Sequence, residues 1–364
     1  MLVFFGNVRC ERCGDRLGYE PATNTMIALG PDGERLIASA GDPSGSAWKY
    51  CANHAHDVCN WVLPADAADA LCRACRHNVT IPDISQPANI APWRKMEQAK
   101  HCLLYTLLRL QLPLHDRSTR PDGLGFEFLR ADDPKREVLT GHADGLITIA
   151  LVEADDAVRE RRRNELGEPY RTLLGHFRHE VGHWYWDQLV RDTRWRATFT
   201  ALFGDASQDY GEALKRYYAA GARPDWQSEL ISAYAGSHPW EDFAETWAHY
   251  LHMIDTLETG RTFGISISPR TDREQVLTTS LDFDVYDPAI DIATLTTAWV
   301  ALSSALNAFN RSMGISDAYP FVLSPKVIEK LGFIHALIQD RRVDARENAV
   351  GRTPLLVDGD PKAA

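Results

Sequence analysis

The sequence lacks the features of a membrane protein or an exported protein. No uninterrupted apolar run reaches the roughly 20 residues that a membrane-spanning helix needs. The N-terminus starts with a short apolar stretch but has no basic region, no long apolar core and no small-residue cleavage site, so it does not resemble a signal peptide. We therefore expect a soluble, cytoplasmic protein with no membrane partner.

The chain is also short of basic residues. Its 39 Lys and Arg residues face 50 Asp and Glu residues, which gives a formal net charge of -11. Because such a field repels polyanions, the composition disfavours nucleic acid as a partner. The hydrophobic share of 45% is typical of a folded globular protein, and 364 residues exceed what one compact core usually holds. We expect more than one domain.

Cysteine is absent from the last two thirds of the chain. The seven cysteines lie at positions 10, 13, 51, 59, 72, 75 and 102, and two pairs have C-x-x-C spacing. In a chain without an export signal, this clustering favours metal thiolates over disulfides. We expect a structural zinc ion on four thiolates, from Cys10, Cys13, Cys72 and Cys75. Two further cysteines, Cys51 and Cys59, flank His54 and His56. They could replace one of these pairs or belong to a second site.

The chain divides by pattern into two main parts and a tail. Residues 1–85 are punctuated by Gly and Cys, with a hairpin tip expected at 31–36, and prolines then break the chain. From about residue 93 the apolar positions follow helical spacing, short strands with turn signals are expected between 126 and 153, and helices follow. The sequence predicts an α+β protein with a metal-stapled module at 1–85, a mainly helical domain with a small antiparallel or mixed sheet at 93–345, and a loosely held tail at 346–364.

One segment carries a metal-binding pattern. His179 and His183 stand four residues apart with Glu180 next to the first, which matches H-E-x-x-H. On a helix both imidazoles lie on one face and can reach a single zinc ion, and the apolar residues around them would bury that helix. Glu180 would then accept a proton from a water molecule that the zinc ion activates. The segment predicts a hydrolytic zinc site with Glu180 as general base.

A catalytic zinc ion needs a third protein ligand from another element. The best donor is the segment at 232–253, where Glu241 and Glu245 are four residues apart in a helix that Pro239 or Trp240 can start. The aromatic residues around them indicate a buried helix, in which two carboxylates require partners. One carboxylate can bind zinc while the other orients a ligand imidazole.

The two segments together resemble the gluzincin peptidases of the anthrax lethal factor type. The resemblance rests on HEVGH followed by Y-x6-E-x-x-A-E. It implies that the catalytic zinc is held by His179, His183 and Glu241, and that Glu245 supports the site. It also implies that Tyr234, seven residues before the ligand glutamate, stabilises the oxyanion, a role that suits a phenol.

The whole chain resembles the bacterial putative zinc-binding metallopeptidases with an N-terminal zinc-ribbon domain. The strings that carry this are CERCGDRLGYEP, CNWVLPADAADALCRACRHNVTIPDIS, HEVGHWYW and HPWEDFAETWAHYLHMIDTLETG. The resemblance implies a zinc ribbon followed by a zincin-like peptidase domain. Relatives commonly carry a further C-x-x-C upstream that this chain lacks, which puts a second complete ribbon site in doubt.

The leading hypothesis is therefore a zinc metallopeptidase that acts on a peptide or protein, which could pair with an edge strand at 146–152. The ribbon could also contact a protein partner. A second hypothesis is a non-catalytic, zinc-stabilised scaffold for protein binding, but a scaffold has no use for Glu180 as a base. Regulation through nucleic acid is a third, which the acidic composition disfavours.

Overall fold

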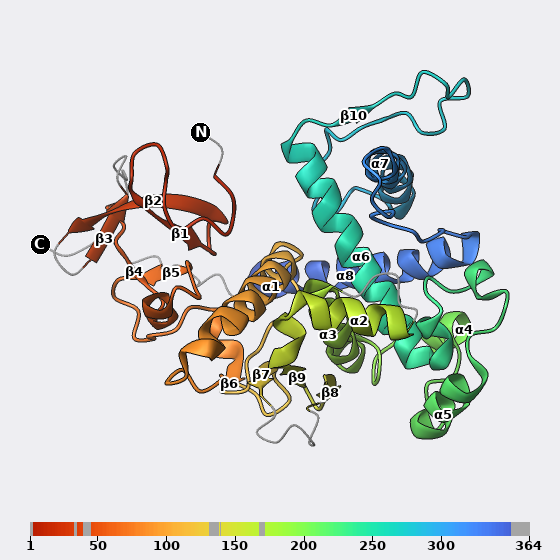
Figure 1. Ribbon diagram of the computed structural model, residues 1–364, viewed down its shortest axis with the longest axis horizontal. Coiled ribbons are helices and arrows are strands. Elements are labelled where there is room, and N and C mark those ends of the chain that lie inside the picture. The colour runs from red at the N-terminus through yellow and green to blue at the C-terminus, as the bar shows by residue number, and fades with distance from the viewer. Residues whose placement is uncertain are drawn as a thin grey trace, which may run out of the picture.

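The computed structural model describes residues 3–32, 35–38, 45–130, 138, 140–166 and 172–350. A strand-rich N-terminal part is followed by a mainly helical part, and the first long helix lies between them (Figure 1). This arrangement is the α+β class that the sequence predicts. Of the expected loose tail, residues 346–350 form the end of the last helix, and 351–364 lie outside the described residues.

The N-terminal part is built on a five-stranded antiparallel sheet with strands in chain order. They are β1 (Arg16–Glu20), β2 (Thr25–Asp32), β3 (Arg35–Ala38), β4 (Trp48–Tyr50) and β5 (Val62–Pro64). Asp32 pairs with Arg35 across the expected hairpin, whose tip at 33–34 lies outside the described residues. Two short 3₁₀ helices carry or flank cysteines: η1 (Ala52–His56) lies between β4 and β5, and η2 (Cys75–His77) follows the sheet. A sheet with so small a core needs a further crosslink.

The second sheet is mixed and has four strands in the order β6, β7, β9, β8. They are β6 (Asn78–Thr80), β7 (Gly125–Leu129), β8 (Gly141–Ala143) and β9 (Leu146–Ala150). β6, β7 and β9 run parallel, and β8 turns back on β9 through Asp144 and Gly145, both at positive φ, as that turn pair predicts. The expected edge at 146–152 is wrong, because β9 is internal and β8 lies outside it.

Eight α-helices make up most of the rest of the described residues. They are α1 (Ile90–Arg109), α2 (Asp156–Leu166), α3 (Leu173–Leu189), α4 (Arg196–Phe203), α5 (Tyr210–Ala220), α6 (Pro239–Thr262), α7 (Ile292–Ser312) and α8 (Pro325–Val350). Short 3₁₀ segments connect them: η3 (Pro87–Asn89), η4 (Leu151–Ala154), η5 (Trp226–Ser228) and η6 (Tyr234–Ser237). A two-stranded ribbon, β10 (Ser266–Ile267) with β11 (Thr279–Ser280), follows α6.

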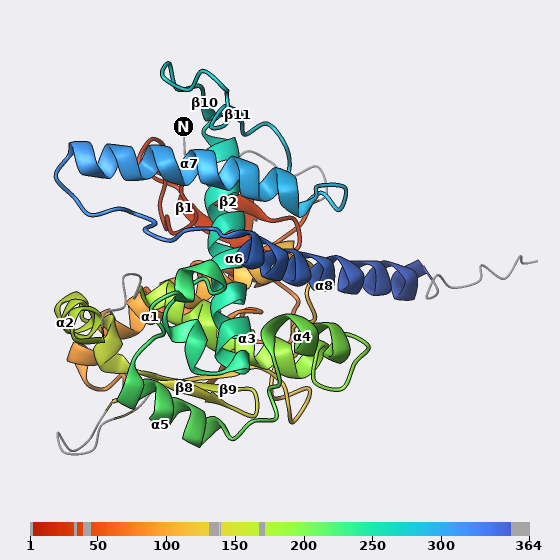
Figure 2. The same ribbon diagram turned by 90° about the vertical axis from the view of Figure 1, so that its right-hand side faces the viewer.

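Helix α6 is the central element of the helical part. It packs against α3, and α7 and α8 both cross it (Figure 2). Pro239 opens α6, and the His238 side chain accepts a hydrogen bond from the Trp240 N–H, which caps the first turn. Phe243 and Trp247 are fully buried, and each such side chain contributes about 1.5–3 kcal/mol of hydrophobic stabilisation. The first turn of α6 is therefore held firmly in place.

Helix α7 is long and apolar enough to cross a membrane by length and composition alone. In the structure it packs against α6 and α8 and buries Leu295, Trp299 and Leu302. Phe309 is exposed near the end of the helix. The buried face of α7 is typical of a core helix in a globular protein.

Candidate metal centres

Three ligand atoms converge where α3 meets α6. His179 Nε2 lies 3.0 Å from Glu241 Oε2, His183 Nε2 lies 3.4 Å from the same oxygen, and the two Nε2 atoms are 3.2 Å apart. The Glu241 side chain is 1% exposed, and those of His179 and His183 are 14% and 4% exposed. The two imidazoles and the carboxylate that the sequence assigns to zinc therefore form one compact, buried group.

The dimensions of this triangle fit a zinc ion. Nitrogen and oxygen ligands at 2.0–2.1 Å in a tetrahedral site lie about 3.3 Å from one another, and the three edges here are 3.0, 3.2 and 3.4 Å. Glu241 Oε2 is buried and has no hydrogen-bond donor in the described part of the chain other than these imidazoles. Two imidazoles and one carboxylate are also a donor set that zinc accepts in catalytic sites.

A glycine allows the two helices to approach closely enough. A Cβ atom added at Gly182 would lie 3.0 Å from the Cα of Ala244 and 3.2 Å from the Cβ of Trp247. Any larger residue would push α6 away from α3. Gly182 thus sets the distance between the helix of the histidines and the helix of the glutamate.

Two of the three ligands, His179 and Glu241, are held by neighbouring side chains. Glu245 Oε1 accepts from His179 Nδ1 at 2.6 Å, and its other oxygen accepts from the Ser232 hydroxyl at 2.6 Å. The Tyr210 hydroxyl donates to Glu241 Oε1 at 2.6 Å. Glu245 therefore takes the place of the supporting carboxylate and fixes the His179 ring so that Nε2 faces the triangle.

Electrostatics in the site follow from burial and pairing. Burial lowers the pKa of His179, but its hydrogen bonds to Glu241 and Glu245 outweigh this and raise that pKa well above its usual value. Burial raises the pKa of Glu241, but His183 and His179 lower it more strongly, so this pKa lies well below its usual value. The carboxylate is therefore ionised, as a metal ligand must be.

The two residues expected to act on the substrate lie beside the triangle. Burial raises the pKa of Glu180, and the neighbouring His179 and His183 oppose that rise. The Tyr234 ring centroid is 6.0 Å from that of His179, and burial together with Glu241 raises the pKa of Tyr234. The phenol keeps its proton and can donate it in a hydrogen bond.

Three contributors were not expected from the sequence. Tyr210 comes from α5 and Ser232 from the loop before η6, and neither belongs to a motif. His142, on β8, has its ring centroid 6.1 Å from that of His183 and accepts from the Gly145 N–H. No local pattern marks them, because they reach the site only through the fold.

The cysteines group differently from the sequence expectation. The four sulfur atoms that lie within 4.8 Å of one another belong to Cys51, Cys59, Cys72 and Cys75. The Sγ atoms of Cys59 and Cys72 are 3.7 Å apart, and thiolates at about 2.3 Å from a tetrahedral zinc ion lie about 3.8 Å apart. The cluster has the dimensions of a four-thiolate zinc site.

This grouping corrects the expected set of Cys10, Cys13, Cys72 and Cys75. The Cys10 and Cys13 pair forms a tight turn before β1, in which the Gly14 N–H donates to the Cys10 carbonyl. Backbone N–H groups of Arg12 and Cys13 lower the pKa of Cys10. The C-x-x-C spacing marks both pairs equally. The strands of the first sheet lead Cys10 and Cys13 away from the cluster, whereas η1 and β5 bring Cys51 and Cys59 to Cys72 and Cys75.

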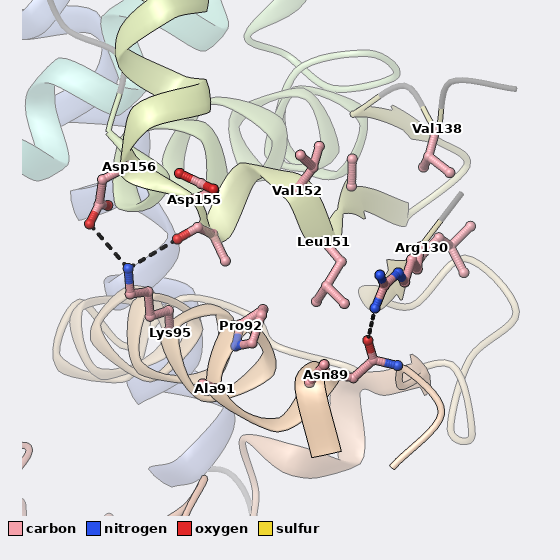
Figure 3. A pocket seen from close by; sticks show the side chains of 14 residues that line it. Asn89, Ala91, Pro92, Lys95, Arg130, Val138, Leu151, Val152, Asp155 and Asp156 are labelled. Atoms are coloured by element: carbon pink, nitrogen blue, oxygen red, sulfur yellow. Dashed lines mark hydrogen bonds and ion pairs between the residues drawn. The ribbon is translucent and has the colours of Figure 1, made fainter. Parts of the chain in front are cut away.

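A separate cavity of about 880 Å³ lies between the start of α1, the end of β7 and η4 (Figure 3). Its lining includes Lys95, paired with Asp156 at 3.1 Å, and Arg130, which donates to Asn89 at 2.6 Å. None of the residues that line it is a member of either metal group. Because its cations are paired, we assign no chemistry to it.

Comparison with known proteins agrees with this geometry. A family described as "Putative zinc-binding metallo-peptidase" matches residues 89–337, and a zinc-ribbon domain matches residues 1–86. Uncharacterized proteins of Mycobacterium bovis and Mycobacterium tuberculosis are each 38% identical over 338 residues, which is 92% of this chain and 92% of theirs. No solved structure matches the chain.

Proposed function

This chain belongs to the putative zinc-binding metallo-peptidase family and carries a zinc-ribbon domain, and on that premise we propose that it hydrolyses peptide bonds as a gluzincin-type enzyme. The catalytic zinc ligands in this proposal are His179, His183 and Glu241. A further zinc ion in the ribbon is held by the four clustered cysteines. The substrate is a peptide or protein, and we expect the reaction to take place in the cytoplasm.

One observation carries the proposal. The three ligand atoms form a triangle with edges of 3.0–3.4 Å, and Glu180 lies beside this triangle without being one of the ligands. A scaffold that needs zinc only for stability would need the ligands alone. Here Glu180 follows His179 on the same helix turn, and burial raises its pKa. A carboxylate with a raised pKa is a better proton acceptor near neutral pH.

The roles of the residues follow from their positions. A bound zinc ion would polarise the scissile carbonyl and lower the pKa of a water molecule. Glu180 accepts a proton from the attacking water and passes it to the leaving amine. Tyr234 donates a hydrogen bond to the carbonyl oxygen as negative charge develops there. Glu245 keeps the His179 ring in the ligand orientation.

The edge of the mixed sheet supplies a place for the substrate backbone. β8 is the outer strand on the side nearest α3, and His142 on β8 lies beside His183. An extended peptide can add to such an edge through main-chain hydrogen bonds. Pairing of this kind fixes the peptide beside the metal and gives little sequence specificity.

The test compares Glu180→Gln and Glu241→Ala with the wild-type protein. Zinc content by mass spectrometry and hydrolysis of a mixed peptide library are measured for each, with Glu212→Gln on the exposed side of α5 as the matched control. Glu180→Gln should keep its zinc and lose about 10²–10⁴-fold in rate. Glu241→Ala should lose the catalytic zinc, while the control should keep both properties.

Two results would contradict the proposal. Equal turnover by wild type and Glu180→Gln would remove Glu180 from the mechanism, and full zinc occupancy in Glu241→Ala would disqualify it as a ligand. If wild type binds zinc fully but cleaves no peptide in the library, the scaffold hypothesis takes its place.

A further inference from the structure

Three ionisable side chains of α1 are buried beneath the cysteine cluster. Glu97 and Lys100 are 0% exposed and His101 is 4% exposed, although such residues are rarely buried without a specific partner. They occupy little more than one turn of α1, the helix that lies between the ribbon and the peptidase helices (Figure 1). The peptidase part of the chain therefore supplies polar groups at the base of the ribbon site.

His101 reaches the sulfur atoms themselves. Its Nε2 atom lies 3.6 Å from Cys59 Sγ and 3.9 Å from Cys75 Sγ. Its ring stacks on the indole of Trp61 in the ribbon, with centroids 5.3 Å apart and an interplanar angle of 24°. Hydrogen bonds that involve sulfur form at such distances, so the imidazole is placed to donate to the thiolates.

The direction of that hydrogen bond follows from the neighbours of Nε2. Glu97 Oε2 lies 3.7 Å away, and a carboxylate, like a thiolate that holds zinc, can only accept. Nε2 must therefore carry a hydrogen. Cys51, Cys59 and Cys72 already accept from backbone N–H groups of the ribbon at 3.3–3.4 Å. His101 adds a donor from outside the ribbon.

Glu97 is occupied and is not itself a ligand. Its Oε1 accepts from Asn78 Nδ2 at 2.7 Å and from the Trp93 indole at 3.0 Å, and its Oε2 pairs with Lys100 Nζ at 2.8 Å. Lys100 also donates to Asn78 Oδ1. Glu97, Cys75 and His101 lie close enough together to hold a metal ion, but these donors already satisfy the carboxylate. The pair of Glu97 and Lys100 instead forms a rigid base beside His101.

The same helix also contacts the elements that carry the catalytic ligands. Thr106 donates to Asp255 of α6 at 2.7 Å, and Asp255 is paired with Arg178, which precedes His179 on α3. Tyr105 donates to Glu258 of α6 at 2.6 Å. Helix α1 thus contacts the ribbon cluster through residues 97–101 and, about one turn later, contacts α6 through Tyr105 and Thr106.

We propose that His101 fastens the metal site of the ribbon to α1 by donating to its thiolates, so that the ribbon metal stabilises the contact between the two domains and the ribbon is a fixed part of the peptidase unit. The proposal rests on a metal ion at the four cysteines and is independent of whether the enzyme cleaves peptides.

The first test measures the affinity of the ribbon site with Co²⁺ in the full-length protein. Charge-transfer absorption from thiolate to cobalt arises only at a cysteine site, so the histidine and glutamate site does not contribute to this signal. Its decrease as a competing chelator is added gives the affinity of the cysteine site. His101→Phe keeps the stack on Trp61 and removes the donor. We expect its cobalt affinity to fall about 10–100-fold, the usual effect of losing a group that supports a metal ligand.

Two further variants define the cause. His101→Gln retains an N–H donor and should recover part of the lost affinity. Gln98→Ala changes an exposed residue of the same helix and should stay within about twofold of wild type. Equal affinities for wild type and His101→Phe would overturn the proposal, as would an equal loss in Gln98→Ala.

The second test reads the domain contact directly by hydrogen exchange. Cys51→Ser removes a thiolate that His101 does not touch and weakens the ribbon site. In the zinc-loaded variant, amides of α1 at 90–109 should exchange at least tenfold faster than in wild type, while those of α7 should be unchanged. Faster exchange confined to residues 48–80 would show an independent ribbon and would overturn the proposal. Neither test uses hydrolysis, so a failure of the proposed peptidase activity would leave both intact.

Discussion

The close approach of α3 and α6 gives the sharpest structural prediction. Gly182→Ala places a Cβ atom 3.0 Å from the Cα of Ala244, and that neighbour is the backbone of a fully buried residue, so it cannot swing aside. Overpacking of this kind costs about 1–3 kcal/mol. The change also removes a glycine from a helix, which by itself stabilises by about 0.8–1.0 kcal/mol. We expect a net loss of about 1 kcal/mol.

A matched glycine separates the two effects. Gly332 lies inside α8, and a Cβ atom there would meet only Ile292 Cγ2, at an ordinary contact distance of 3.6 Å. Gly332→Ala should therefore gain the helix-propensity term without the steric cost. The difference between the two variants in free energy of unfolding, about 1–3 kcal/mol, isolates the steric term.

Urea unfolding followed by circular dichroism measures that difference, and zinc content measures its consequence at the site. Pushing α6 away from α3 moves Glu241 away from both imidazoles, so Gly182→Ala should bind the catalytic zinc more weakly than Gly332→Ala. The reasoning is refuted if the two alanine variants are equally stable and bind equal zinc. That result would mean that the helices can separate without cost and that their distance does not set the ligand triangle.

Three other predictions follow from single contacts. Tyr210→Phe removes the hydroxyl that donates to the ligand carboxylate, so the catalytic zinc should bind about 10–100-fold more weakly in a chelator competition. Lys330→Met leaves Asp242 buried without its ion-pair partner and should lower the free energy of unfolding in urea by about 3–5 kcal/mol. Adding Asp242→Leu should restore most of the lost stability. No recovery would mean that the broken ion pair is not the cause of the loss. Leu295→Ala, in the buried face of α7, should cost about 2–5 kcal/mol, whereas Phe309→Ala at the exposed end should change stability by no more than about 0.5 kcal/mol; similar costs would contradict the assignment of α7 as a core helix.

The parts of the site that lie within one helix could be predicted from the sequence. His179 and His183 are brought together by helical spacing alone, and Glu241 stands out because an acid in an aromatic helix needs a partner. The same spacing argument placed Glu245 beside Glu241 on α6. Local periodicity and the cost of burying charge drew attention to all four residues, but only the family resemblance indicated which of the two carboxylates would bind the metal.

The parts that depend on chain path could not be predicted. Two C-x-x-C pairs look alike in sequence, but only the second lies beside Cys51 and Cys59, which flank η1 between β4 and β5. The outer position of β8 likewise depends on strand order, which neither strand encodes. Tyr210 lies 31 residues from the carboxylate that it holds. Pairings of this kind are decided by tertiary packing, and no local pattern precedes them.

The polar residues of α6 explain how one helix can belong to the core and also carry a proposed metal ligand. A buried carboxylate is costly unless it is paired, and here each has its own partner from a different element. Asp242 pairs with Lys330 of α8, and Glu245 pairs with His179 of α3. These pairs fix the rotation of α6 from two sides. Glu241 precedes both in the first turn of α6 and directs one oxygen only at the two imidazoles, so the rest of the helix determines where the proposed metal ligand points.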